Sequence, residues 1–415
     1  MRILKLELKR ILNTRITWIL LALCLFLSVC MAYLPVTFLY HNYTDKNGNE
    51  IELTGLDALK YEKSQQKDLS GEVTPEKVRD ALQVYQACLN EYGVKEPYEL
   101  PDGVYSERMT PYTPLLHGLK EAFADPDTGI APSLMDIDPK EVDDFYSKCD
   151  DRVVSLMKME QADHPAAQNK AVSLYQQVEK PMFFYPGLDS NVIEYQLFLA
   201  FLILMICTLI TAPVFSSDYQ TGADDILRCT KHGRVRLCVT RIICAMCICG
   251  IIYVFSSAIY IIVSNSLFGW ESTKTSMQLI FSITNLANLN LGQLQFIEAL
   301  AGLLSLMAAT SLTLFFSSKA KNTMISAAAA LLFCILPIMI YMILPGDISL
   351  WIRSFLPACG LALQSSFLYA LIEFQFLNIG NLAIWSPYAI IGFAALEIPL
   401  FLGLTIHAYS TRKIK

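Results

Sequence analysis

The sequence predicts an all-α fold: a six-span polytopic helical membrane protein with a helical extracellular domain between spans one and two. Of its 415 residues, 54% are hydrophobic and only 17% are charged, and the mean hydropathy is +0.41. Ordinary soluble domains are less apolar and more highly charged than this chain. Several apolar runs and one long hydrophilic segment after the first of them complete the pattern.

A helix needs roughly 20 apolar residues to cross a bilayer, and six runs of about that length are present. They are Ile16–Leu39, Val192–Val214, Cys238–Ser264, Ile297–Phe316, Met324–Leu344 and Tyr388–Ala408. A basic segment precedes the first run, as in a secretory signal. This run is longer than the apolar region of a signal, about 7–15 residues, and no A-x-A cleavage site follows it. We therefore interpret the first run as a retained anchor.

Basic residues set the expected orientation, because cytoplasmic loops hold an excess of Lys and Arg. With six spans, four basic clusters fall on one side of the membrane. They are Arg2, Lys5, Lys9, Arg10 and Arg15; Arg228, Lys231, Arg234, Arg236 and Arg241; Lys319 and Lys321; and Arg412, Lys413 and Lys415. We expect a multi-pass protein of the plasma membrane with both termini in the cytoplasm.

One further stretch, Phe355–Phe374, is apolar and nearly long enough to span. Counting it as a span would place the basic tail outside, so we interpret 352–376 as outer re-entrant or interfacial helices. Pro357, Gly360 and the polar Gln364 suit backbone that does not span and is covered by protein.

The segment between the first two spans is too long for a simple connection and should form a domain. Residues 41–194 carry 29 acidic and 15 basic residues, a net charge of −14, whereas the rest of the chain carries +8. Thr74 before Pro75, and Asp138 before Pro139, are typical helix starts. A third helix is expected over Ala166–Glu179.

Cys88 and Cys149 are the two cysteines of this outer domain, and each lies on the apolar face of an expected helix. An oxidising exterior would allow a disulfide between them. Two separate buried thiols are an equally good interpretation.

No catalytic constellation is found in the sequence. There is no G-x-x-x-x-G-K-[ST] phosphate loop, no G-x-S-x-G elbow and no H-E-x-x-H pair, and the five histidines are scattered. We therefore expect neither an enzyme nor a metal site, and no cofactor in this chain.

A few polar residues within the spans are candidates for a transport pathway. Glu397 lies in the last span, and burying a carboxyl in lipid is unfavourable. It either lines a substrate path or forms a hydrogen bond within the bundle. Thr208 and Thr211 in span two, and Thr310 in span four, have the same two interpretations, since threonine is also an ordinary helix-packing residue.

The charged connector between spans two and three begins "FSSDYQTGADDILRC". Ser217 is a candidate cap for a short helix, and acidic residues early with Arg228 late would complement its dipole. A cytoplasmic helix continuous with two spans can transmit a push, although a solvated loop helix is the simpler alternative.

This connector resembles that of permease subunits of exporter-class (type 2) ABC transporters. In that family seven residue types recur in a fixed order at this place. They are an aromatic residue, an acidic residue, a Gly, a Leu, a small or polar residue, an Arg and a Lys. The matching positions are Phe215, Asp218, Gly222, Leu227, Thr230, Arg234 and Arg241. Asp218 replaces the usual Glu, and Arg241 replaces the usual Lys. The chain is also similar to permeases of Gram-positive gut bacteria that have an acidic helical outer domain.

The resemblance implies that the connector, 215–230 including Asp224, is a coupling helix seated in a separate ATPase subunit, which would bind ATP and Mg²⁺. It also implies a second permease subunit, identical or different, and an amphipathic elbow helix at 1–15 on membrane lipid. Lys5, Lys9 and Arg10 would face lipid headgroups. Span one would occupy 16–40, the outer domain 41–191, spans two to six 192–409, and the basic tail 410–415.

We therefore expect a permease that exports an amphiphile, such as a peptide antibiotic, a lipid or a drug, with no nucleic acid partner. The main alternative is a membrane receptor whose outer domain binds a ligand without transport. A polytopic membrane enzyme is a third interpretation, which the lack of a catalytic cluster disfavours.

Overall fold

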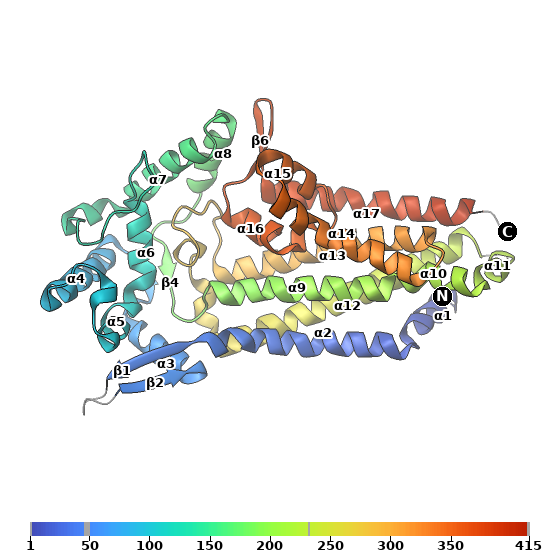
Figure 1. The fold of residues 1–415 in the computed structure, drawn as a ribbon, viewed down its shortest axis with the longest axis horizontal. Coiled ribbons are helices and arrows are strands. Elements are labelled where there is room, and N and C mark those ends of the chain that lie inside the picture. The colour runs from blue at the N-terminus through green and yellow to red at the C-terminus, as the bar shows by residue number, and fades with distance from the viewer. Residues whose placement is uncertain (1, 45–49, 231–232, 413–415) are drawn as a thin grey trace.

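The computed structural model describes residues 2–44, 50–230 and 233–412. It shows an elongated helical bundle with a separate domain at one end and both chain ends at the other (Figure 1). We call these the domain end and the termini end. Lys231, Lys413 and Lys415 of the expected basic clusters lie outside the described residues, as does the side chain of Arg2.

Six helices in the described chain are long and apolar enough to cross a membrane, which confirms the expected number. Their helical segments are α2 (Arg15–Tyr33), α9 with α10 (Ser190–Thr211 and Pro213–Thr221), α12 (Val235–Phe268), α13 (Leu291–Lys319), α14 (Thr323–Ile343) and α17 (Ser386–Thr411). A short helix, α1 (Arg2–Leu12), precedes them and packs on α12.

The centre of the bundle is α13, which packs against α9, α12, α14 and α17. In the most apolar parts of α9 and α13, 67% and 61% of residues are buried, against 22% in α14 and 28% in α2 and α17. The apolar faces of α2, α14 and α17 are therefore largely uncovered by this chain. Such faces suit lipid or another membrane subunit.

The domain between α2 and α9 is mostly helical. Its helices are α3 (Gly55–Gln65), α4 (Pro75–Tyr92), α5 (Asp102–Arg108), α6 (Thr113–Ala122), α7 (Phe145–Glu160) and α8 (Pro165–Tyr175). Two small antiparallel pairs join β1 (Tyr40–Thr44) to β2 (Glu50–Thr54), and β3 (Gly71–Glu72) to β4 (Phe183–Phe184).

The starts of two expected helices can be compared with the structure. Thr74 caps α4 by accepting a hydrogen bond from Lys77 N, as expected. Asp138 also caps, but the helix that it begins is a 3₁₀ segment, Pro139–Asp144, and α7 starts only at Phe145. Asp138 accepts a hydrogen bond from Lys140 N, two residues on, which is one of the two ordinary N-cap bonds.

The two domain cysteines are free and buried in the structure. Cys88 lies on α4 and Cys149 on α7, and α6 packs against both of these helices. Of the two interpretations left open by the sequence, the structure therefore contains the one with separate thiols.

The domain is fastened to the connection between α12 and α13. Glu121 at the end of α6 accepts hydrogen bonds from Ser282 Oγ (2.5 Å) and Ile283 N (2.8 Å). The Tyr175 hydroxyl of α8 donates to the Ile283 carbonyl at 2.8 Å. The domain thus contacts the bundle through more than its two chain connections.

Residues 345–385 form an irregular segment at the domain end, and Phe355–Phe374 does not span. The segment holds α15 (Gly346–Ser354), two 3₁₀ turns, α16 (Phe367–Ile372) and the hairpin of β5 (Phe376–Ile379) and β6 (Leu382–Trp385). Gly360 lets this segment approach α13 closely, because any Cβ there would collide with Ser305 of α13.

Gly187, just before α9, is a close approach between the domain and the bundle. Its φ is +141°, and a Cβ there would overlap the carbonyl oxygen of Phe268 at the end of α12. We expect Gly187→Ala to lower the free energy of unfolding by about 1–3 kcal/mol, as for overpacking in a core. Thermal unfolding in detergent measures this. Gly403→Ala is the control, because nothing lies within 4 Å of a Cβ at that helical position; equal effects would contradict the prediction.

Candidate functional site

The connector between spans two and three lies at the termini end, beside α1 (Figure 1). It is two short helices, α10 and α11 (Ala223–Arg228), separated by Gly222 with φ of +73°. Glycine populates this left-handed conformation without strain. The expected single helix over 215–230 is therefore wrong. So is the expected cap, since α10 starts at Pro213 and Ser217 Oγ donates to the Pro213 carbonyl at 2.6 Å.

Four charged side chains meet where α1, α10 and α12 pack together, and we call them the ion cluster: Glu7, Arg10, Asp218 and Arg241. Arg241 Nη2 lies 2.5 Å from Asp218 Oδ2, and its Nε lies 3.3 Å from Glu7 Oε2. Arg10 Nε lies 2.8 Å from Glu7, and its Nη1 lies 3.2 Å from Asp218. Arg10 was expected at lipid headgroups; its guanidinium forms these ion pairs while the side chain stays 32% exposed.

Three of the four side chains in the ion cluster are buried, so each charge depends on its partners. The Arg241 side chain is only 1% exposed, and those of Glu7 and Asp218 are 10% and 12% exposed. Removing one partner from such a group leaves a charge in a poorly solvated place, which is costly. Two carboxylates and two guanidinium groups balance in charge, so α1, α10 and α12 are held in one relative position.

A second contact ties the connector to α17. Arg228 Nε lies 2.7 Å from Asp224 Oδ2, and both side chains are almost fully buried. Arg228 also donates to the backbone carbonyls of Tyr409 (2.6 Å) and Arg412 (2.7 Å) at the end of α17. The Tyr409 ring packs on Phe215 with centroids 5.2 Å apart.

The tip of the connector remains exposed. Ile226 of α11 is 75% exposed, although its helix is held on the other side by the buried Arg228 and Asp224. Asp225 beside it is also exposed, and Leu227 is half-buried. The connector thus has a rigid, charged base and an apolar tip that faces away from the bundle.

The structure brings several residues of the connector motif together and separates others. Phe215, Asp218 and Arg241 belong to one packed unit, since the Arg241 guanidinium lies 5.8 Å from the Phe215 ring. Gly222 forms the break between the helices. Arg234 precedes α12 as its N-cap residue and makes no hydrogen bond through its side chain as a cap.

Sequence reasoning missed Glu7 and Ile226. Glu7 is the acidic residue within an otherwise basic and apolar helix, "RILKLELKRIL", and that exception is the available signal. For Ile226 the pattern offers none, because the neighbouring Leu227 looks equally apolar and only the fold exposes one more than the other.

The candidate pathway residues lie in two places. The Thr211 hydroxyl of α9 lies 3.4 Å from the Cys249 sulfur of α12. It donates a hydrogen bond to the Cys207 carbonyl at 2.7 Å. Thr310 of α13 is fully buried near the same Cys249. Thr208 contacts Cys334 of α14 at 3.5 Å. Glu397 lies apart from them on α17, buried, with Oε2 unpartnered.

A further buried carboxyl, Glu298 of α13, was not recognised in the sequence because it stands at the very start of an apolar run. It is 4% exposed, and neither carboxyl oxygen has a hydrogen-bond partner. One helical turn before it, Gln295 accepts from Asn265 Nδ2 at 3.0 Å. Spans three and four therefore share a polar layer inside the bundle.

Comparison with known families decides the identity of this arrangement. A family model described as "ABC-2 family transporter protein" matches residues 1–359, which include the connector and the first five spans. The chain belongs to the ABC-2 family of transporters. No curated protein sequence matches it significantly.

As an ABC-2 permease the chain is a membrane transport subunit rather than an enzyme, and permeases of this family work with ABC ATPase subunits. No group of three or more metal-ligating side chains occurs in the parts of the chain that the structure describes. What this chain itself supplies is a helical bundle with a charged connector at one end.

The ion cluster predicts a large cost for Asp218→Asn. Arg241 would keep only Glu7, so we expect the free energy of unfolding to fall by about 3 kcal/mol, the lower end for breaking a buried pair. Asp57→Asn is the control, since its pair with Lys60 is 72% and 76% exposed and should contribute less than about 1 kcal/mol. Denaturant titration in detergent compares the two; similar small losses would show that the ion cluster is not stabilising.

Proposed function

We propose that this ABC-2 permease moves an amphiphilic compound across the plasma membrane, powered by separate ATPase subunits that bind the tip of α11. The observation that carries the proposal is the connector itself: an exposed apolar tip on a base that is locked to three spans. A docking surface needs an apolar anchor, and a coupling element needs a rigid connection to the moving part.

The transmission route follows from the contacts. A push on α11 acts on Arg228, which holds the end of α17 through two backbone carbonyls. Through α10 the same push acts on Asp218, which is paired to α1 and α12. A movement of the ATPases would therefore shift α1, α9, α12 and α17 together rather than bend the connector alone.

The proposed orientation places the termini end in the cytoplasm, where ATP is available. Basic residues support it, because Arg10, Arg228, Arg241 and Lys319 all belong to segments at that end, and Lys and Arg are retained on the cytoplasmic side. The α13–α14 junction with Lys319 is fixed there by Ser317 of α13, which donates to the Ala212 carbonyl at 2.6 Å. The acidic domain would then be extracellular.

A second permease subunit, identical or homologous, is part of the proposal. The uncovered apolar faces of α2, α14 and α17 offer area both for such a subunit and for lipid. We propose that Thr208, Thr211, Thr310 and Glu397 contribute polar groups along the pathway. In this structure these four residues contact groups of the same bundle. They would contact the substrate only when the helices of the bundle move apart.

An amphiphile as substrate is supported by the domain surface. Tyr98 and Tyr105 are 82% and 41% exposed, and they line a shallow cavity of about 530 Å³ together with Leu100 and Asn42. Aromatic side chains with an apolar body and a polar tip suit compounds of mixed polarity. The same cavity would also serve a receptor that binds a ligand without transport.

The docking role of α11 is tested with Ile226→Asp. A buried charge at an apolar anchor costs enough to weaken an interface about tenfold or more, so we expect loss of the ATPase on co-purification from the native host and loss of substrate-stimulated ATP hydrolysis. Ile130→Asp is the matched control, because Ile130 is 71% exposed at the domain end. Both variants should fold.

Two results would contradict the permease proposal. One is that the wild-type chain, purified from its native host, brings down no ATPase. The other is that the wild-type chain exports no amphiphile while its domain still binds a ligand, which would favour the receptor. Unchanged ATP hydrolysis and export in Ile226→Asp would contradict only the docking role of α11.

A further inference from the structure

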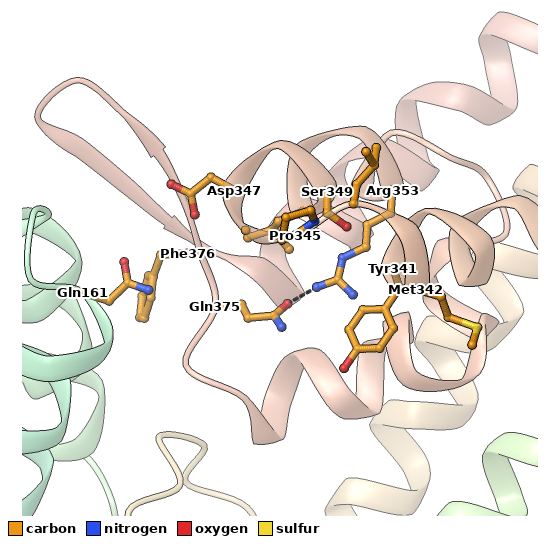
Figure 2. Close-up of a pocket in the computed structure, with 12 residues that line it drawn as sticks. Gln161, Tyr341, Met342, Pro345, Asp347, Ser349, Arg353, Gln375 and Phe376 are labelled. Carbon is orange, nitrogen blue, oxygen red and sulfur yellow. Dashed lines mark hydrogen bonds between the residues drawn. The ribbon is translucent and has the colours of Figure 1, made fainter. Parts of the chain in front are cut away.

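A cavity of about 530 Å³ opens at the domain end, between the end of α14, the first turn of α15 and the loop before β5. Figure 2 shows its lining, with Arg353 and Tyr341 on one side and Gln161 of the domain on the other. The walls thus come mainly from residues 341–353 and 375–376, with Gln161 added by the domain, which is distant in sequence.

Arg353 is the charged group that is buried in this cavity. The residue is 4% exposed, and its Nε and Nη1 have no hydrogen-bond partner. Its Nη2 donates to Gln375 Oε1, and its guanidinium lies 4.9 Å from the centre of the Tyr341 ring. A guanidinium remains protonated in proteins and carries five donors, so two unused buried donors indicate a missing acceptor.

The nearby carboxyl groups do not supply that acceptor. Glu373 accepts a hydrogen bond from Gln375 Nε2, and burial raises the pKa of its carboxyl although Arg353 lowers it by a smaller amount. Asp347 at the mouth lies 3.5 Å from His164 Nε2 and is 58% exposed. Glu373 thus acts on Arg353 through its charge, but Nε and Nη1 of Arg353 have no acceptor in the described chain.

One side of the rim, opposite in character to exposed Asp347, is apolar and lies where span five ends. Met342 is 79% exposed and Leu344 is 37% exposed, and both line the opening where span five ends. Ile348, one turn into α15, is 69% exposed. An anionic group reaching Arg353 from this side would have apolar surface directly beside it.

We propose that this cavity binds the phosphate group of a phospholipid, with the guanidinium of Arg353 as its partner and the acyl chains along the exposed face of α14. Arginine makes strong, charge-assisted hydrogen bonds to phosphate oxygens, and Nε and Nη1, which lie on different edges of the guanidinium, are both without a partner to receive them. The site does not depend on an ATPase subunit or on transport.

The test is native mass spectrometry of the full chain released from micelles containing phosphatidylglycerol, with uncharged diacylglycerol as the second arm. We expect one phosphatidylglycerol retained per chain and no diacylglycerol. Arg353→Gln should weaken retention about tenfold or more, the loss for a charge-assisted hydrogen bond. Arg152→Gln is the matched control, because Arg152 is also buried with unpartnered Nε and Nη1 but does not line this cavity.

A second variant keeps the arginine in place. Gln375→Glu would put a carboxylate on Arg353, so we expect a folded protein that no longer retains phosphatidylglycerol. Retention equal to wild type in folded Gln375→Glu or Arg353→Gln would overturn the proposal. So would equal retention of diacylglycerol, or occupation of the site by inorganic phosphate alone with no lipid retained.

Discussion

The structure depends on one electrostatic constraint, the burial of Arg241 inside the termini end of the bundle. An arginine that is 1% exposed is tolerated only where carboxylates compensate its charge. Asp218 from α10 and Glu7 from α1 meet that requirement, and Arg10 balances the second carboxylate. The pairing of Arg241 with these carboxylates therefore fixes the position of α1 and the direction of the connector.

The two ends of the bundle differ in which groups are paired inside the protein and which are left exposed. At the termini end, charges are paired inside the protein and an apolar side chain, Ile226, is left outside. At the domain end, Arg353 is left without a full set of acceptors, while the domain is fastened by Glu121 and Tyr175. One end is suited to a protein partner, and the other to an anionic ligand at the membrane surface.

Local patterns made much of this fold predictable. Apolar runs of spanning length and the cap at Thr74 depend on neighbouring residues, and the structure has both. The ion cluster could not be predicted, because Glu7 and Arg241 are 234 positions apart and only helix packing brings them together. The connector shows a mixed outcome: Gly222 was recognised as part of a motif, but the break that it makes depends on a helix that already starts at Pro213.

Whether the ion cluster makes α1 and the connector one rigid unit is the central claim, and pulsed electron resonance tests it directly. Spin labels on native Cys229 and on Cys introduced at exposed Lys9, with Cys30 and Cys247 replaced, report the distance between α11 and α1. The account predicts one narrow distance distribution that is the same without nucleotide and in the ATP-trapped complex with the ATPase. A distribution that shifts or broadens between these states would contradict it.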